Sequence, residues 1–242
     1  MRKVFIGFDP RQIVAYTAAQ MSVIETAAVP VAITPLIYQT LPMTRKGLTP
    51  FTWSRFLVPW LCNYEGWGLF LDADCYVRSD IDQLFQIGEL NPDKAVLVSD
   101  ACVGQFAFER AAVMLFNCAH PDNKKLTPEF INNDETKGLH AIGWTDAIGD
   151  FPGDFNHLVH YHPEKADARI VHFTQGVPAW PETLDGEHTG EWRETLQKAF
   201  TAQPWASLMG NSVHAQHVVA RLEEKAKKAN GKAEPENIPG VV

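Results

Sequence analysis

Trp67-Gly-Leu-Phe-Leu-Asp-Ala-Asp74 is an apolar run that ends directly in two carboxylates. The apolar part carries no polar side chain, which predicts a strand over 67–71 that is covered on both faces. Strands of this kind belong to parallel sheets flanked by helices. In such sheets, the residues that follow the carboxyl end of a central strand line the ligand crevice. We therefore expect Asp72 and Asp74 at the edge of a binding site.

Strands and helices alternate on both sides of this segment. Short apolar runs predict further strands over 4–8, 31–37, 95–98 and 112–116. Apolar residues at helical spacing predict helices over 12–26, 52–61, 79–85, 128–132 and 192–200. Pro59 should kink or shorten the second helix, and Thr189 should cap the last. The alternation predicts an α/β fold with a mixed, mostly parallel central sheet flanked by helices.

The C-terminal part of the sequence differs from the rest. We expect one domain over residues 1–205, followed over 206–242 by a helix and a frayed, Lys-rich tail. The run from Lys225 to Lys232 is interpreted as a solvated face, the alternative being a basic contact with an anionic partner.

Composition and charge exclude several classes of protein. The 242 residues include 21 Lys and Arg against 29 Asp and Glu, a net charge of −8, and 45% of them are hydrophobic. This balance is that of a globular protein and disfavours a nucleic-acid binder, because phosphate contacts need a basic face. No apolar run reaches the ~20 residues that span a bilayer, and the run after Lys3 ends at Asp9, too early for a signal peptide. The four cysteines form no C-x-x-C pair, so we expect free thiols and a cytoplasmic protein.

The spacing of Asp72 and Asp74 favours a metal site. Side chains two residues apart on an extended chain point to the same face, and two adjacent carboxylates repel each other unless a cation neutralises them. A hard divalent ion prefers such oxygen ligands and can hold a diphosphate while negative charge grows on it. The alternative is a pair of turn or capping aspartates, which is how we interpret Asp80 and Asp82 at a helix start.

Motifs of other enzyme classes are absent from the sequence. It has no G-x-G-x-x-G after a strand, no P-loop, no H-E-x-x-H and no G-x-S-x-G. Dinucleotide-binding enzymes, zinc proteases and serine hydrolases are therefore disfavoured. His157, His160 and His162 form a dense group, but no carboxylate motif lies beside them in sequence, and we interpret them as structural.

Six segments form a recognisable series between residues 4 and 180. They are Ile6-Gly-Phe-Asp-Pro-Arg11 with Tyr16, Phe51-Thr-Trp-Ser-Arg-Phe-Leu-Val-Pro59, Leu69-Phe-Leu-Asp-Ala-Asp-Cys-Tyr-Val77, Val113-Met-Leu-Phe-Asn117, Ile148-Gly-Asp-Phe-Pro-Gly-Asp-Phe-Asn156 and Val171-His-Phe-Thr-Gln-Gly-Val-Pro-Ala-Trp180. In order and spacing the series resembles glycosyltransferase family 8 and its bacterial and phage relatives. The resemblance implies a Rossmann-like fold of the GT-A type, a nucleotide-sugar donor and retention of the anomeric configuration.

The resemblance also implies roles for individual residues. The implied donor contacts are Phe8, Asp9, Tyr16, Arg55, Asp72, Ala73, Asn117 and Gly176, and the implied metal ligands are Asp72, Asp74 and His172. Catalytic roles go to Arg55, which would reach the donor phosphates or the sugar, and to Asp146, the nearest match to the family's Asp-Gln-Asp segment. The chain departs from the family at Val177-Pro-Ala179, where a Lys normally touches the diphosphate.

We expect transfer of a hexose, glucose or galactose, from a UDP-sugar to an acceptor. One imidazole beside two carboxylates favours Mn²⁺, with Mg²⁺ as the alternative. The acceptor stays open between a glycan, a lipopolysaccharide, a protein and a modified base of phage DNA, so nucleic acid enters only as an acceptor. Two other functions stay open. One is a nucleotidyltransferase that makes a nucleotide-sugar, although its basic loop would have only Arg11 here, and the other is a non-catalytic module that binds a nucleotide-sugar.

Overall fold

A computed structural model describes residues 1–133, 135 and 138–200 of the chain. The chain divides into two compact units, Met1–Leu196 and Gln197–Val242. The first unit contains the features discussed below. The predicted domain end at residue 205 and the predicted helix and tail over 206–242 lie outside the described residues.

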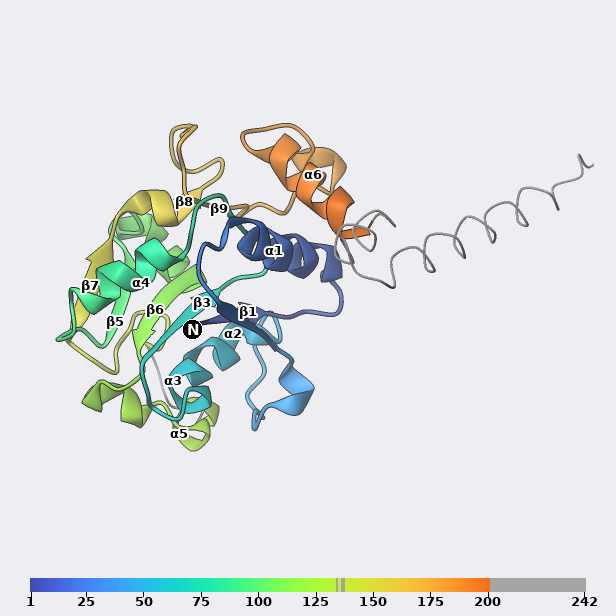
Figure 1. The fold of residues 1–242 in the computed structure, drawn as a ribbon. Helices are drawn as coiled ribbons and strands as arrows, with labels where there is room; N and C mark the ends of the chain where they lie inside the picture. Colours follow the sequence, from blue (N-terminus) through green and yellow to red (C-terminus); the bar gives the residue numbers. More distant parts are fainter. Residues whose placement is uncertain (134, 136–137, 201–242) are drawn as a thin grey trace, which may run out of the picture. The chain divides into compact units, whose positions relative to one another are not determined.

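The core of the first unit is a six-stranded sheet with the strand order β2-β1-β3-β6-β5-β7 (Figure 1). Its strands are β1 (Arg2–Gly7), β2 (Val31–Leu36), β3 (Trp67–Leu71), β5 (Val96–Ser99), β6 (Val113–Asn117) and β7 (Ile148–Phe151). β1 pairs in parallel with β2 and β3, and β5 pairs in parallel with β7. β6 runs antiparallel to both of its neighbours, β3 and β5. The predicted mixed, mostly parallel sheet is therefore confirmed.

Helices cover both faces of this sheet (Figure 1). Leu69 and Leu71 of β3 pack in one apolar cluster with residues of α1 (Ile13–Thr26) and α4 (Asp82–Glu89). Phe70, which points the other way, packs in a second cluster with residues of the short helices α3 (Val58–Leu61) and α5 (Pro128–Asn132). Side chains of a strand alternate between the faces, so an apolar run needs cover on both. The interpretation of 67–71 as a central strand is confirmed.

A second sheet of three short strands continues from the end of β3. It has the order β4-β9-β8, with β4 at Cys75–Val77, β9 at Ile170–His172 and β8 at His157–Leu158. β4 and β9 are antiparallel, and Cys75 pairs directly with His172. Strands of two or three residues are too short to show a period, and the sequence did not indicate them. Their pairing brings distant segments of the chain together.

Two predicted helices differ in detail from the structure. The predicted helix 52–61 is α2 (Phe51–Ser54), a 3₁₀ turn (Arg55–Leu57) and α3. Pro59 has no N–H to bond the carbonyl of Arg55 four residues earlier, so the regular helix is interrupted there. α6 (Thr189–Phe200) begins at Thr189 itself, whose hydroxyl donates to the carbonyl of Gly186 at 3.0 Å, so the prediction of a Thr189 cap was wrong.

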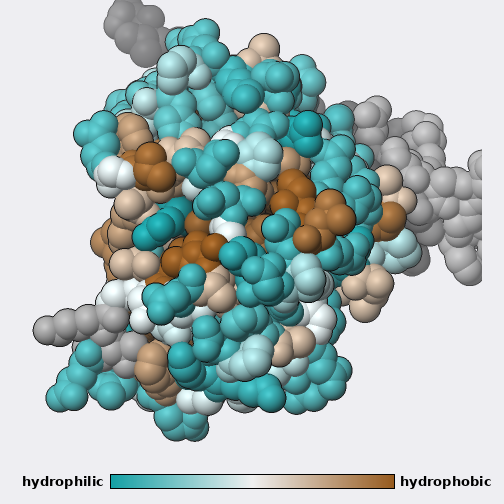
Figure 2. All heavy atoms as spheres, turned by 90° about the vertical axis from the view of Figure 1, so that its left-hand side faces the viewer, coloured by the Kyte–Doolittle hydropathy of each residue, from teal (hydrophilic) through white to brown (hydrophobic). Residues whose placement is uncertain are grey.

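The surface agrees with the composition. The face shown in Figure 2 is mostly hydrophilic, with apolar residues gathered near its middle. Among the described residues, no helix is long and apolar enough to cross a membrane.

Gly68 of β3 tests how tightly the sheet is packed. An added Cβ would lie 2.7 Å from Cγ1 of Val58 and 3.2 Å from Sγ of Cys62. We expect Gly68→Ala to lower the free energy of unfolding by about 1–3 kcal/mol, because overpacking displaces neighbouring side chains. Gly190 has no atom within 4 Å of an added Cβ. Gly190→Ala is therefore the matched control and should be neutral or slightly stabilising in denaturant unfolding.

Candidate active site

The turn between β3 and β4 carries the two predicted carboxylates. The amide of Asp72 donates to the carbonyl of Ala112 at 2.8 Å, and the amide of Cys75 donates to the carbonyl of Asp72 at 3.1 Å. This bond closes a tight turn, whereas the sequence had suggested an extended chain with both side chains on one face. Asp72 is directed at Arg55, and Asp74 is directed at His172.

Asp74 and His172 form the first half of the site. Oδ1 of Asp74 lies 3.5 Å from Nε2 of His172. The pairing of β4 with β9 accounts for this contact, and the amide of Phe173 donates to the carbonyl of Asp74 at 3.1 Å. Burial opposes charge on both groups, yet each stabilises the charge of its partner. The pKa of Asp74 is consequently lowered and the pKa of His172 is raised.

This pair suits a divalent cation. Within the described part of the chain, Asp74, Cys75 and His172 offer three ligand atoms within 4.8 Å of one another. Nδ1 of His172 is buried and has no hydrogen-bond partner among the described residues. Without a metal, burial together with Asp74 and Asp72 raises the pKa of the Cys75 thiol well above its ordinary value. The carboxylate of Asp74 and the imidazole of His172 are donors that suit a divalent cation.

Asp72 and Arg55 form the second half of the site. Nη2 of Arg55 lies 3.0 Å from Oδ1 of Asp72, and Nη1 donates to Oδ2 at 3.1 Å. The same guanidinium donates to the carbonyls of Ala111 (2.7 Å) and Thr52 (3.2 Å). Burial raises the pKa of Asp72 to about 6, although the charge of Arg55 lowers it. Arg55 thus forms an ion pair with Asp72 and bonds two carbonyls, and its contact with the donor stays a prediction.

A cavity of 270 Å³ lies beside Asp74. Arg11, Gly176 and Trp180 are among the residues that line it. Gly176 has a φ of +114°, which favours glycine, and Trp180 is 59% exposed. The cavity brings two predicted site residues, Asp74 and Gly176, to one place.

Of the other predicted donor residues, Asp9 contacts Arg11, and Phe8 contacts Tyr16. Asp9 is buried, and its Oδ2 accepts from Nη2 of Arg11 at 2.6 Å, a bond that lowers the pKa of Asp9. The ring of Phe8 packs edge-on against Tyr16 at 5.2 Å. Ala73 is buried inside the turn. Arg11, which the sequence suggested only as the basic residue of its loop, lines the cavity beside Asp74.

Asn117 and Asp146 do not lie with the other predicted residues. Asn117 pairs with Trp67 at the start of β3, about 16 Å along the strand from Asp72 at ~3.3 Å per residue. Because β6 is antiparallel, its end lies at the opposite edge of the sheet from the end of β3. The amide of Asn117 donates to the carbonyl of Ala95, and the amide of Ala95 donates to the carbonyl of Ala147. Asp146, the residue before Ala147, therefore lies at the same edge of the sheet as Asn117. The structure therefore does not bring Asn117 and Asp146 together with Asp74 and His172.

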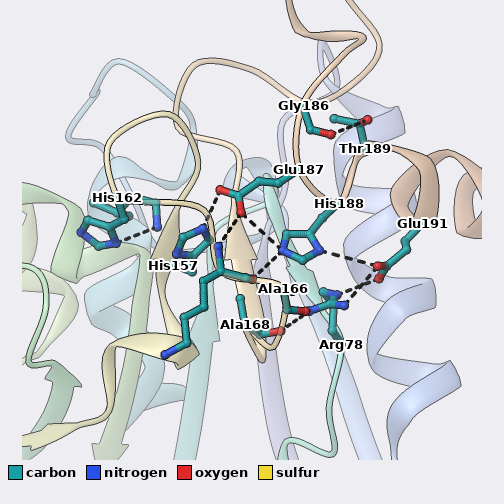
Figure 3. Close-up of polar contacts among 12 residues, drawn as sticks. Arg78, His157, His162, Ala166, Ala168, Gly186, Glu187, His188, Thr189 and Glu191 are labelled. Carbon is teal, nitrogen blue, oxygen red and sulfur yellow. Dashed lines mark hydrogen bonds and ion pairs between the residues drawn. The ribbon is translucent and has the colours of Figure 1, made fainter.

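Two of the three clustered histidines, His157 and His162, belong to a hydrogen-bond network. Figure 3 shows Nε2 of His157 bonded to Glu187 at 2.6 Å, and Glu187 also accepts from the amide of Lys165 at 2.9 Å. Nδ1 of His162 accepts from the amide of Leu158 at 3.2 Å. Nearby, Arg78 pairs with Glu191 of α6 at 2.7 Å. These bonds tie β8 to the segment before α6, which agrees with the interpretation of the histidines as structural.

No protein-family model matches the chain. It is 30% identical over 227 residues to Protein CDI of Arabidopsis thaliana, an alignment that covers 81% of this chain and 86% of that protein.

Solved structures share the fold. The glycosyltransferase GlyE of Streptococcus pneumoniae TIGR4 superimposes with a TM-score of 0.57 at 16% identity, over 81% of this chain and 61% of GlyE. The galactosyltransferase LgtC gives a TM-score of 0.56 at 12% identity, over 83% of this chain and 97% of LgtC. The bifunctional glycosyltransferase WbbM gives 0.61 at 12% identity, over 91% of this chain and 51% of WbbM. The chain thus spans about three fifths of GlyE and half of WbbM, and its fold is that of GT-A glycosyltransferases.

Proposed function

The chain belongs to the family of Protein CDI of Arabidopsis thaliana, and from the fold and the site we propose that it is a metal-dependent, retaining glycosyltransferase. Its donor would be a UDP-hexose, with glucose or galactose as the transferred sugar. The observation that carries the proposal is the meeting of Asp74 and His172 beside the 270 Å³ cavity. Carboxylate, imidazole and cavity together can hold a cation and the diphosphate that it neutralises.

The charges around the cavity suit a diphosphate. Asp74 and His172 would hold Mn²⁺, or Mg²⁺ in its place, and a bound cation stabilises the negative charge that develops on a departing diphosphate. Arg11 lines the same cavity, and Asp9 fixes its guanidinium. We infer that Arg11 supplies the positive charge for which the family uses a Lys near Val177-Pro-Ala179. Arginine suits this role because its fork of donors matches phosphate oxygens.

Arg55 and Asp72 act as one unit in this proposal. Arg55 holds the carboxylate of Asp72 through two nitrogens, so Asp72 keeps a fixed orientation next to Asp74. Asp72 can then accept a hydrogen bond from a hydroxyl of the donor. Arg55 is a positioning residue here, since its guanidinium is already bonded within the protein.

Retention of configuration follows from a front-face attack. Asp146 lies at the far edge of the sheet from Asp74, so the proposal assigns the carboxylate no part in the transfer. We propose that the acceptor hydroxyl attacks the anomeric carbon on the face from which the diphosphate leaves. The bond from the anomeric carbon to the phosphate oxygen breaks, and the departing diphosphate takes the hydroxyl proton. The charged groups around the diphosphate stabilise this step most.

A donor panel tests the function. The purified chain is incubated with UDP-, GDP- and dTDP-hexoses in Mn²⁺, in Mg²⁺ or with a chelator, and the released nucleotide is measured. We expect UDP from a UDP-hexose in Mn²⁺ and a loss of about 100-fold on chelation, equivalent to ~2.7 kcal/mol of transition-state stabilisation. Pyrophosphate formed from UTP and a sugar 1-phosphate would instead identify a nucleotidyltransferase. Tight donor binding without any release would identify a binding module.

A further inference from the structure

A second and larger cavity, of 470 Å³, lies outside the donor site just described. Its walls include Arg45, Trp53, Phe108, Arg110 and His140, and it shares no lining residue with the cavity beside Asp74. A volume in this range is typical of a site for a small molecule. The proposed binding of the donor does not use this cavity.

This cavity adjoins the Arg55–Asp72 pair. Arg110 directly precedes Ala111, whose carbonyl accepts from Nη1 of Arg55 at 2.7 Å. The next carbonyl along the chain, that of Ala112, accepts from the amide of Asp72 at 2.8 Å. One short segment therefore runs from the wall of the cavity to the turn that carries the carboxylates. A molecule bound in the cavity lies next to the groups proposed to orient the donor.

The polar lining of the cavity includes the guanidinium groups of Arg110 and Arg45, both of which are bonded within the protein. Arg110 donates from Nη2 to the carbonyl of Ala141 at 3.3 Å, and Arg45 donates from Nη1 to the carbonyl of Ile131 at 3.2 Å. Among the described residues, Nε of Arg110 and Nε2 of His140 are buried and have no hydrogen-bond partner. None of the described residues that line the cavity carries a carboxylate. Protein atoms enclose both nitrogens, so the accessible donors of the lining are the terminal nitrogens of Arg110.

The apolar lining consists of aromatic rings. Phe108 is 64% exposed and stacks on His140 with centroids 4.9 Å apart and planes 15° apart. The guanidinium carbon of Arg45 lies 3.6 Å from the centroid of the Trp53 ring. Burial, followed by the charges of Arg55 and Arg45, lowers the pKa of His140 to about 4, so its ring is neutral at pH 7. Flat apolar surfaces beside fixed polar groups suit a ring that carries polar substituents.

We propose that this cavity binds the acceptor and that the acceptor is a saccharide with an acidic group, a carboxylate or a phosphate. Arg110 would hold the acidic group, because guanidinium groups bond such anions through pairs of N–H donors. The exposed ring of Phe108 would cover the sugar ring. The role as acceptor site rests on the proposed function, whereas the preference for an acidic saccharide is a property of the cavity alone.

Binding of three sugars to the metal-free protein tests this preference. Glucose 6-phosphate, glucuronic acid and glucose share a ring and differ in charge. We expect at least one of the two acids to bind about tenfold or more tighter than glucose in calorimetry, a difference of ~1.4 kcal/mol. Whichever of the two acidic sugars binds more tightly identifies phosphate or carboxylate as the preferred group. Equal dissociation constants for all three sugars would overturn the proposal.

Variants locate the preference in the cavity. In Arg110→Gln the acidic sugar should bind no more tightly than glucose. In Arg110→Lys part of its higher affinity should remain. Phe108→Ala should lower the binding affinity for all three sugars by similar factors. Lys124→Gln, which removes an exposed cation at the far edge of the sheet, is the charge-matched control and should keep the full advantage. An advantage that persists in Arg110→Gln would contradict the proposal, because the anion would then bind elsewhere.

Transfer to the same sugars separates the two proposals. UDP release without acid selectivity in binding would leave the proposed function standing and refute the acidic acceptor. Acid selectivity that depends on Arg110, in a protein that releases no nucleotide from any donor, would refute the proposed function and leave the anion site standing. When both hold, the acid should also be the better acceptor, with kcat/KM about tenfold above that of glucose.

Discussion

Asp74→Asn should reduce UDP release by about 1,000-fold or more while the free energy of unfolding changes little. The substitution keeps the shape of the side chain and removes the charge that faces His172 at 3.5 Å. A ligand that loses its charge weakens cation binding, and about 1,000-fold corresponds to ~4 kcal/mol of transition-state stabilisation. Steady-state kinetics in saturating donor and Mn²⁺ titrations followed by electron paramagnetic resonance measure the two effects.

Asp93→Asn is the matched control for this variant. Asp93 lies on the surface and pairs with the neighbouring Lys94 at 3.2 Å. We expect unchanged kinetics and unchanged Mn²⁺ affinity, because exposed ion pairs contribute little. Wild-type turnover and wild-type Mn²⁺ affinity in Asp74→Asn would refute the proposal that Asp74 binds the cation.

Arg55→Gln should damage both stability and transfer. Asp72 would lose the partner that offsets its burial, and breaking a buried ion pair typically costs about 3–5 kcal/mol. We expect transfer to fall by about 100-fold, chiefly in kcat, because the carboxylate next to Asp74 would lose its fixed orientation. Chemical denaturation and kinetics measure the two losses. In the double variant with Asp72→Asn, much of the stability should return but none of the activity, because no buried charge is left unpaired.

The pH dependence of Arg55→Gln has a definite sign. Burial already raises the pKa of Asp72 to about 6, above its unfolded value, so the ionised form costs stability as pH rises through that range. Without Arg55 the pKa rises further, and this cost continues to grow above pH 6. In the presence of a chelator, the loss of stability in Arg55→Gln should therefore be smaller at pH 5 than at pH 8. An equal loss at both values would show that the charge of Asp72 is not what Arg55 stabilises.

The sequence predicted the central strands because their cause is local. Trp67–Leu71 is apolar throughout, and the structure starts and ends β3 at the same residues. The direction of β6 has no such local signal, since an apolar run looks the same whichever way it crosses a sheet. Asn117 was therefore predicted at the wrong edge. Pairing partners decide the direction, and they are chosen in three dimensions.

The site shows the same division. Asp74 and His172 were predicted as partners through the resemblance, and the structure brings them together. The pairing of Arg55 with Asp72 depends on where the broken helix of residues 51–61 packs against the sheet, which composition and spacing do not reveal. Arg11 was underestimated because its neighbours in the cavity, Gly176 and Trp180, are far away in sequence.

The antiparallel register that sets Cys75 opposite His172 has a consequence for biosynthesis. β1, β3 and β6 all precede residue 118, so their part of the large sheet can pair while the nascent chain is still being translated. The imidazole at the end of β9 emerges from the ribosome much later. Until β9 pairs with β4, the nascent chain has Asp74 but not the imidazole that faces it in the folded protein. We therefore expect the proposed cation site to form only after residue 172 has been synthesised and β9 has paired.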